Sequence, residues 1–163
     1  MDTNLQYNYL MQFIKSTISV FVAAAFFLLI NGNCFGQDYS SRIKICGNSI
    51  DQKSFSKSDV DAILKGKINN WRNGNGVLII LNFSENGNAE CVGQQVYNKS
   101  VNGVKKFWLG VVFQGRANAP IFAEDNEEVL RLITKNKGAI GVLVDYKGEI
   151  PAEFKVKITK SSL

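Results

Sequence analysis

The spacing of apolar and polar positions alternates along the chain between strand-like and helix-like periods. A short alternation at residues 42–46, with two isoleucines on one face, predicts the first strand. Continuous apolar runs at residues 77–81 and 139–144 predict strands that are buried on both faces, as in a parallel sheet. A further alternation at residues 154–158 predicts a strand at the edge of the sheet.

Helix-like spacing separates these strands. Ser56 suits the N-cap of a helix whose apolar face contains Val60, Ile63 and Leu64, and Gly66 suits its end. The other helices are predicted over residues 91–98, from Ser100 or Asn102 to residue 113, and from Asp125 or Asn126 to residue 137. Strands that alternate with helices predict an α/β fold with a mixed, mainly parallel sheet flanked by helices.

The first 36 residues differ in character from the rest. Lys15 is their one basic residue, an apolar run follows at residues 18–30, and small residues end at Gly36. This order is typical of a secretory signal peptide, and the run is short for a membrane span, which needs about 20 residues. We therefore expect a signal peptide at residues 1–36, one domain at residues 37–163 and a periplasmic or secreted location. An uncleaved N-terminal anchor is the alternative.

Composition narrows the possible chemistry. The chain has no His, which excludes Ser-His-Asp and Cys-His catalysis and any zinc site that contains His. No activated nucleophile and no paired acid and base stand out, so we expect a non-enzymatic protein without a cofactor or metal. The net charge of +5 favours acidic partners, while export argues against nucleic acid. Cys46 and Cys91 either form a disulfide or remain as buried thiols.

Polar loops at the predicted strand ends are the candidate ligand sites. Open α/β sheets bind ligands outside the carboxyl ends of their strands, and loop N–H groups before a helix can hold an anion without a special side chain. We expect residues 47–49, residues 84–90 and the loop around Arg116 to meet at that edge of the sheet. The candidate ligand-binding residues are Ser49, Ser84, Asn86, Gly87, Asn88 and Arg116.

Each candidate also has a purely structural interpretation. The loop at residues 84–88 could be an ordinary connection with Ser and Asn as caps, and Arg116 could be a solvated residue or a helix C-cap. The carboxylates of Glu85 and Glu90 would repel a bound anion. Trp71 and Trp108 fit packing roles better than ligand stacking.

Four segments in order resemble the phosphate-type substrate-binding proteins of ABC transporters. They are residues 62–71 (AILKGKINNW), KKFW with FQGR at residues 105–116, GAIG at residues 138–141, and the first strand with its end at residues 43–49. The resemblance covers about residues 42–146. It implies a type II periplasmic-binding-protein-like fold, whose lobes hold an oxyanion with loop N–H groups, hydroxyls and sometimes an Arg.

The sequence departs from the pattern of that family in its anion loop. Ser84 matches the family, but Asn86 stands where Ser is usual and Ala89 where Arg is usual. Outside the loop, Arg116 matches the Gly-Arg of the family, and Ser49 matches its early Ser. The anion-binding loop is therefore degenerate compared with the family.

Length limits the architecture that the resemblance implies. Residues 37–163 are too few for two lobes of about 100 residues each, so we expect a single lobe that cannot close around a ligand. The expected function is that of an exported solute-binding protein for phosphate or a similar oxyanion, associated with ABC-type uptake and its membrane transporter. The alternative is a degenerate lobe that serves as a protein-interaction module at the cell envelope.

Overall fold

The computed structural model describes residues 39, 41–52 and 54–159, so the predicted signal peptide lies outside the described residues. The elements follow one another as β1 (Ile43–Gly47), β2 (Ser54–Ser56), α2 (Lys57–Leu64), β3 (Leu78–Asn82), α3 (Asn88–Val92), the π-helical turn η1 (Gly93–Tyr97), α4 (Val101–Phe113), β4 (Ile121–Ala123), α5 (Asn126–Lys135), β5 (Ala139–Val144), the 3₁₀ turn η2 (Ala152–Phe154) and β6 (Lys157–Thr159).

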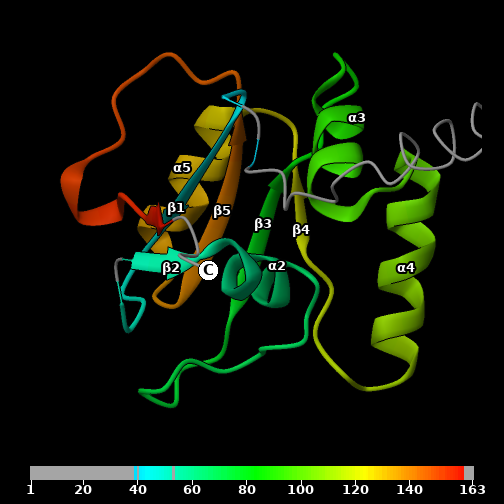
Figure 1. Ribbon diagram of the computed structural model, residues 1–163, viewed down its shortest axis with the longest axis horizontal. Helices are drawn as coiled ribbons and strands as arrows, with labels where there is room; N and C mark the ends of the chain where they lie inside the picture. Colours follow the sequence, from blue (N-terminus) through cyan, green and yellow to red (C-terminus); the bar gives the residue numbers. More distant parts are fainter. Residues whose placement is uncertain (1–38, 40, 53, 160–163) are drawn as a thin grey trace, which may run out of the picture. The chain divides into compact units, whose positions relative to one another are not determined.

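The main sheet has the strand order β1-β5-β3-β4. Strand β3 is parallel to both of its neighbours, β5 and β4, whereas β1 runs antiparallel to β5. The predicted α/β class with a mixed, mainly parallel sheet is therefore confirmed. Figure 1 shows β3 and β5 side by side at the centre of this sheet.

Helices cover both faces of the sheet. Apolar residues of α2, α3, η1 and α4 pack with alternate residues of β1, β3 and β5 in one core cluster. The intervening strand residues, including Ile80 and Leu143, pack against α5 in a second cluster. Because side chains alternate across a strand, the two continuous apolar runs serve both clusters, which explains their lack of polar positions.

Two short strands escaped the sequence prediction, and the predicted edge strand is shifted. Strands β2 and β4 have three residues each, which is too short for a periodic signal. Of the predicted residues 154–158, the first lies in η2, and β6 starts only at Lys157. This strand pairs in parallel with β2 in a separate two-stranded sheet. Lys155, just before it, forms an isolated antiparallel bridge with Cys46 of β1, the outer strand of the main sheet.

Local capping agrees with the predicted helix starts. Ser56 and Asp59 form a capping box at α2, and Ser100, not Asn102, accepts the N–H of Gly103 at the start of α4. Asp125 accepts the N–H of Glu128 at α5. These three helices therefore begin where a side-chain oxygen accepts one of their first N–H groups.

Cys46 and Cys91 are free, buried thiols. Cys46 belongs to the cluster on the α5 face of the sheet, and Cys91 belongs to the cluster on the other face. Burial raises the pKa of the Cys46 thiol to about 12. Of the two alternatives that the sequence left open, the structure contains the unlinked pair.

Both tryptophans pack in the core, as expected. Trp71 is 5% exposed and donates its indole N–H to the Gly138 carbonyl at 2.8 Å. Trp108 is 2% exposed and donates to the Tyr97 hydroxyl, which in turn donates to the Leu64 carbonyl. These bonds satisfy the polar end of each buried ring.

Candidate functional site

The carboxyl ends of the parallel strands lie at one edge of the main sheet. Strands β3, β4 and β5 end there at Asn82, Ala123 and Val144, and antiparallel β1 begins there at Ile43. The loop from Phe83 to Gly87 follows β3 and leads into α3. This edge therefore brings together the loop from Phe83 to Gly87, the start of α5 and the residues that precede β1.

Asn82 is the centre of a buried polar network at this edge. Its side chain is fully buried, and its Oδ1 accepts from the Ser84 N–H at 3.3 Å, the Ser84 hydroxyl at 3.0 Å and the Asn88 Nδ2 at 3.3 Å. Its Nδ2 donates to Asn126 Oδ1 at 2.8 Å. One asparagine thus links the loop from Phe83 to Gly87 and the start of α3 to the end of β3.

Asn126 joins the same network to β5. Its Oδ1 accepts the Val144 N–H at 3.0 Å, and its Nδ2 donates to the Val144 carbonyl at 2.8 Å. The backbone of Val144 therefore fixes which way the Asn126 amide points, and this in turn requires Asn82 to present its NH₂ group. The start of α5 is locked to the sheet by side-chain amides.

The loop residues Ser84, Asn86, Gly87 and Asn88 lie together, as the sequence predicted. The Ser84 hydroxyl also lies 2.8 Å from Asn86 Oδ1, and Asn88 Nδ2 donates to the Ser84 hydroxyl at 3.0 Å. Since a hydroxyl has one proton, Ser84 donates to either Asn82 or Asn86, not to both at once. Much of the polar capacity of these side chains is therefore used within the loop.

Gly87 leaves the start of α3 open. It is the N-cap residue, has a φ of 93°, and offers no side-chain hydrogen bond to the first turn. Glycine adopts this left-handed conformation without steric cost, and the first N–H groups of a helix have no partner within the helix. The Ala89 N–H is already used, because it donates to the Ser84 carbonyl at 3.1 Å. Among the described residues, this leaves the N–H groups of Asn88 and Glu90 for an external acceptor, with the side chains of Ser84 and Asn88 as polar surroundings.

The start of α5 is closed by its own carboxylates. Asp125 Oδ1 accepts the Glu128 N–H at 2.6 Å, and Glu128 Oε2 accepts the Glu124 N–H at 2.9 Å. An anion at this helix would have to displace these carboxylates and would meet their charge. The start of α3, by contrast, has no side-chain cap from the part of the chain that the structure describes, although Glu90 places a negative charge in its first turn.

Ser49 and Arg116 lie at the opposite edge of the sheet, so the expectation that all three segments meet is wrong for these two residues. Strand β1 is antiparallel, so its end lies beside the start of β5, where the Asn48 N–H donates to the Ala139 carbonyl. Arg116 follows α4 and precedes β4, and its carbonyl accepts from Asn69 Nδ2. The sequence pattern did not reveal the direction of β1.

The two residues also line separate hollows. Ser49 lines one of about 250 Å³ that Glu153 and Lys155 share. Arg116 lines one of about 320 Å³ together with Asn69 and Asn70. The Arg116 side chain donates to Gln114 in solvent. Neither residue can contribute to the same bound ion as the loop at residues 84–88.

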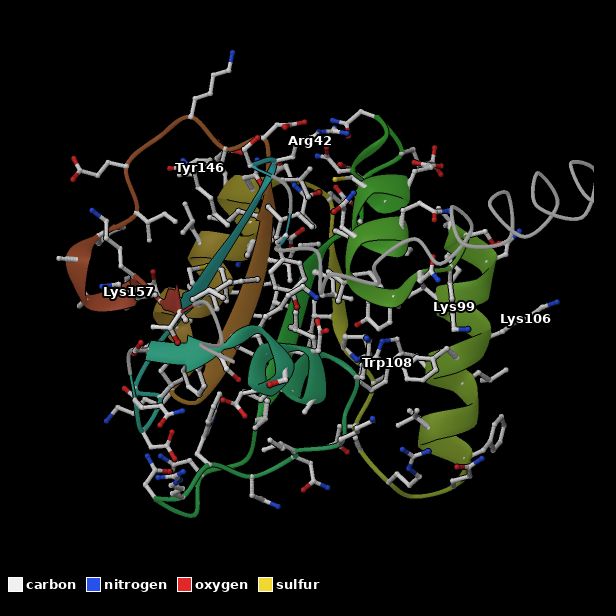
Figure 2. The ribbon with its side chains drawn as sticks, in the orientation of Figure 1. Arg42, Lys99, Lys106, Trp108, Tyr146 and Lys157 are labelled. Atoms are coloured by element: carbon white, nitrogen blue, oxygen red, sulfur yellow. The ribbon has the colours of Figure 1, made fainter. Side chains whose placement is uncertain are left out.

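Arg42 is a residue at the carboxyl edge that the sequence analysis missed. Its guanidinium binds the Asp145 carboxylate at 3.0 Å through Nε and 2.6 Å through Nη2. This arginine holds the pKa of Asp145 below its usual range. The positive charge of Arg42 also acts on Cys91 of α3 and opposes the effect of burial on the pKa of that thiol. Figure 2 shows Arg42 close to α3.

The positions of Arg42 and Asp145 in the sequence indicate this pair only if β1 and β5 are known to be antiparallel and in this register. Arg42 directly precedes β1 and Asp145 directly follows β5, and these two positions face each other only if the strands are antiparallel. The Asp145 N–H donates to the Arg42 carbonyl, which continues the ladder by one pair. The pair supplies a cation at the edge, largely neutralised by its own carboxylate.

Residues 39, 41–52 and 54–159 contain neither a candidate metal site nor a candidate membrane span. No group of His, Cys, Asp or Glu side chains in this part of the chain could hold a metal ion. None of the helices there has the length and apolar character that a bilayer crossing requires.

Comparison with known proteins gives structural neighbours only. No protein-family model and no curated protein matches the chain. An ABC-type phosphate transport receptor from Vibrio cholerae is similar with 15% identity, a TM-score of 0.44 and coverage of 73% of this chain and 46% of the receptor. PstS from Borrelia burgdorferi has 14% identity, a TM-score of 0.44 and coverage of 63% and 40%.

A substrate-binding protein from Clostridium perfringens, solved with bound phosphate, has 17% identity, a TM-score of 0.44 and coverage of 73% and 44%. The chain thus spans less than half the length of each of these three proteins. They belong to the class of receptor that the sequence motifs resemble.

Proposed function

We propose that this protein is an exported, non-enzymatic solute-binding protein that holds an oxyanion at the start of α3. The observation that carries the proposal is the helix start behind Gly87, which has no side-chain cap among the described residues and leaves the N–H groups of Asn88 and Glu90 free, although the Ala89 N–H donates to the Ser84 carbonyl. The hydroxyl of Ser84 and the amide of Asn88 lie beside it. Helix N-terminal N–H groups and neighbouring hydroxyls are natural ligands of phosphate-like anions. The motif resemblance makes inorganic phosphate the first candidate and an ABC-type membrane transporter the candidate partner.

The proposed ligand-binding residues are Ser84, Asn86, Gly87 and Asn88. Arg42 is a cation at the same edge, and rearrangement of its pair with Asp145 would add charge to the site. Asn86 is exposed, so a bound anion would stay in contact with water on one side. Affinity should therefore be modest unless a partner covers the ion.

Titration with inorganic phosphate tests the proposal. We expect the amide NMR signals of Gly87 and Asn88 to shift in millimolar phosphate but not in chloride of the same ionic strength. Ser84→Ala should weaken binding about tenfold or more, because a hydrogen bond to a charged group contributes about 1.5–3 kcal/mol. Ser84→Thr, which keeps the hydroxyl, should restore most of the affinity.

Ser49→Ala is the matched control, because it removes the same hydroxyl at the opposite edge of the sheet and should leave binding unchanged. Unmoved signals of Gly87 and Asn88 would rule out oxyanion binding at α3. An equal loss in both alanine variants would show that the effect is not local to the loop.

The second candidate function is an interaction module at the cell envelope. It is favoured by the internal hydrogen bonds of Ser84, Asn86 and Asn88 and by the exposed carboxylates of Glu85 and Glu90. This function predicts no response to phosphate. It also predicts that the wild type captures an envelope protein and that the combined Glu85→Lys and Glu90→Lys substitutions abolish this capture. Glu127→Lys, at an exposed position of α5, should leave the capture unchanged.

A further inference from the structure

The outer side of α4 combines exposed apolar side chains with cations. Leu109 is 58% exposed, Val112 41% and Phe113 81%. On the inner side of the same helix, Val104, Trp108 and Val111 are buried against the core. Figure 2 shows Lys106 directed away from the body of the domain, whereas Trp108 lies on the side that faces the sheet.

The cations and apolar residues lie in one stripe along the helix. Positions three and four apart share a helix face, so Lys105 and Lys106 precede Leu109, which precedes Val112 and Phe113. Arg116 follows at the same spacing just beyond the helix end, and Lys99 lies just before its start. We call the exposed members of this stripe the α4 face: Lys105, Lys106, Leu109, Val112, Phe113 and Arg116.

The charge of this region has one sign. No Asp or Glu occurs between Glu90 and Glu124, and Lys99, Lys105, Lys106 and Arg116 all fall within that interval. Among the described residues, the lysines of α4 take part in no ion pair. The α4 face therefore offers its cations to an external anionic partner.

We propose that the α4 face docks on a bilayer surface that contains anionic lipids. Amphipathic helices of this kind place Phe and Leu among the acyl chains near the headgroups while Lys and Arg meet lipid phosphates. The apolar side chains project from a convex helix and are flanked by lysine, a residue that is depleted from protein–protein interfaces. A second copy of the chain would bring the same cations to the same face, which disfavours self-association.

A local fluorescence probe tests the docking in the full chain. Trp71 and Trp108 are buried, so they give a constant background, and Phe113→Trp adds a reporter at the most exposed apolar position. We expect its emission to shift to the blue and to be quenched by brominated lipids in vesicles that contain phosphatidylglycerol. Pure phosphatidylcholine vesicles should give neither effect, and high salt should reverse both.

Two double substitutions of lysine, each made together with Phe113→Trp, measure how much the lysines contribute to partitioning onto anionic vesicles. Lys105→Gln with Lys106→Gln should weaken partitioning to the anionic vesicles about 30-fold, because each Lys near an anionic surface contributes about 1 kcal/mol and 1.4 kcal/mol is tenfold. Lys135→Gln with Lys137→Gln removes the same charge from exposed positions at the end of α5 and should have no such effect. The apolar run at residues 18–30 is common to all these chains and cancels in the comparison.

Three results would overturn the proposal. The first is equal quenching on neutral and anionic vesicles, and the second is no quenching on either. The third is a blue shift of the reporter that depends on protein concentration without lipid, which would assign the α4 face to self-association. Oxyanion binding at α3 is measured separately with Ser84→Ala, so failure of one proposal leaves the other standing.

Discussion

Asn82→Asp should destabilise the fold by about 3 kcal/mol or more at neutral pH. The substituted side chain would be fully buried and would direct a carboxylate oxygen at Asn126 Oδ1, which is itself an acceptor held by Val144. A buried carboxylate without a cation loses its hydration, and the hydrogen bond to Asn126 is lost as well. Urea unfolding at several pH values measures the free energy of unfolding.

The destabilisation should shrink as the pH falls. Full burial and the facing Asn126 oxygen would raise the folded-state pKa of the new carboxyl above its unfolded value of about 3.9, against the opposite effect of the donors on Ser84 and Asn88. The folded state therefore favours the protonated form, which can again donate a proton to Asn126. The penalty is smallest below the unfolded pKa and grows as the pH rises through that value towards the folded pKa.

Asn86→Asp is the matched control for this experiment. It makes the same chemical change in the same loop, but Asn86 is exposed and only accepts the Ser84 hydroxyl, which a carboxylate can also do. We expect a change within about 0.5 kcal/mol. Similar unfolding free energies for the two variants would contradict the central role of Asn82 in holding this edge together.

Gly141→Val should destabilise the fold by about 3 kcal/mol by forcing α5 away from the sheet. A Cβ atom at Gly141 would lie 2.7 Å from Val129 Cγ1 and 3.1 Å from two atoms of Ile133. Both neighbours are fully buried on α5, so neither can move aside freely. Overpacking of this kind costs about 1–3 kcal/mol, and the two γ carbons of valine put it at the upper end of that range.

A control substitution on α4 and a double substitution test whether the destabilisation by Gly141→Val comes from a clash with α5. Gly110→Val is made on α4, where a Cβ meets nothing within 4 Å, and should leave stability unchanged or raise it slightly because Gly is a poor helix former. Adding Val129→Ala to Gly141→Val should cost less than the sum of the single substitutions, since it makes room for the new side chain. Strict additivity in urea unfolding would contradict the proposed clash.

The elements that the sequence predicted well are those with strong periodic or capping signals. The two continuous apolar runs became β3 and β5, and the capping residues Ser56 and Asp125 begin α2 and α5. The helix at residues 91–98 was recognised, although it starts earlier, at Asn88, and changes to a π-helical turn at Gly93. Its weak apolar pattern gave little information about that start.

The candidate site was predicted in part. The loop from Ser84 to Asn88 follows β3, a central strand that is parallel to both neighbours. Such a loop lies at the carboxyl edge of the sheet, independently of the direction of the outer strand β1. Ser49 was expected at the same edge because it follows the first predicted strand, and Arg116 because its loop was also expected to end there. Their placement depends on the direction of β1 and on the existence of β4, and neither has a signal in the local pattern.

Asn82 and Arg42 show why the remaining site residues could not be predicted. An asparagine at the end of an apolar run looks like the first loop residue, and only the packing of α5 against β5 makes it a buried partner of Asn126. Arg42 meets Asp145 across 103 positions of sequence, through an antiparallel register that local spacing does not encode.

The sequence by itself determined the α/β class, the two central strands and a polar loop before α3, because each rests on residues that are neighbours along the chain. Only the tertiary structure decided which loops share an edge, which helix start is open and which side of α4 faces solvent. Those outcomes follow from strand direction and long-range packing, where the free energy depends on residues far apart in the sequence.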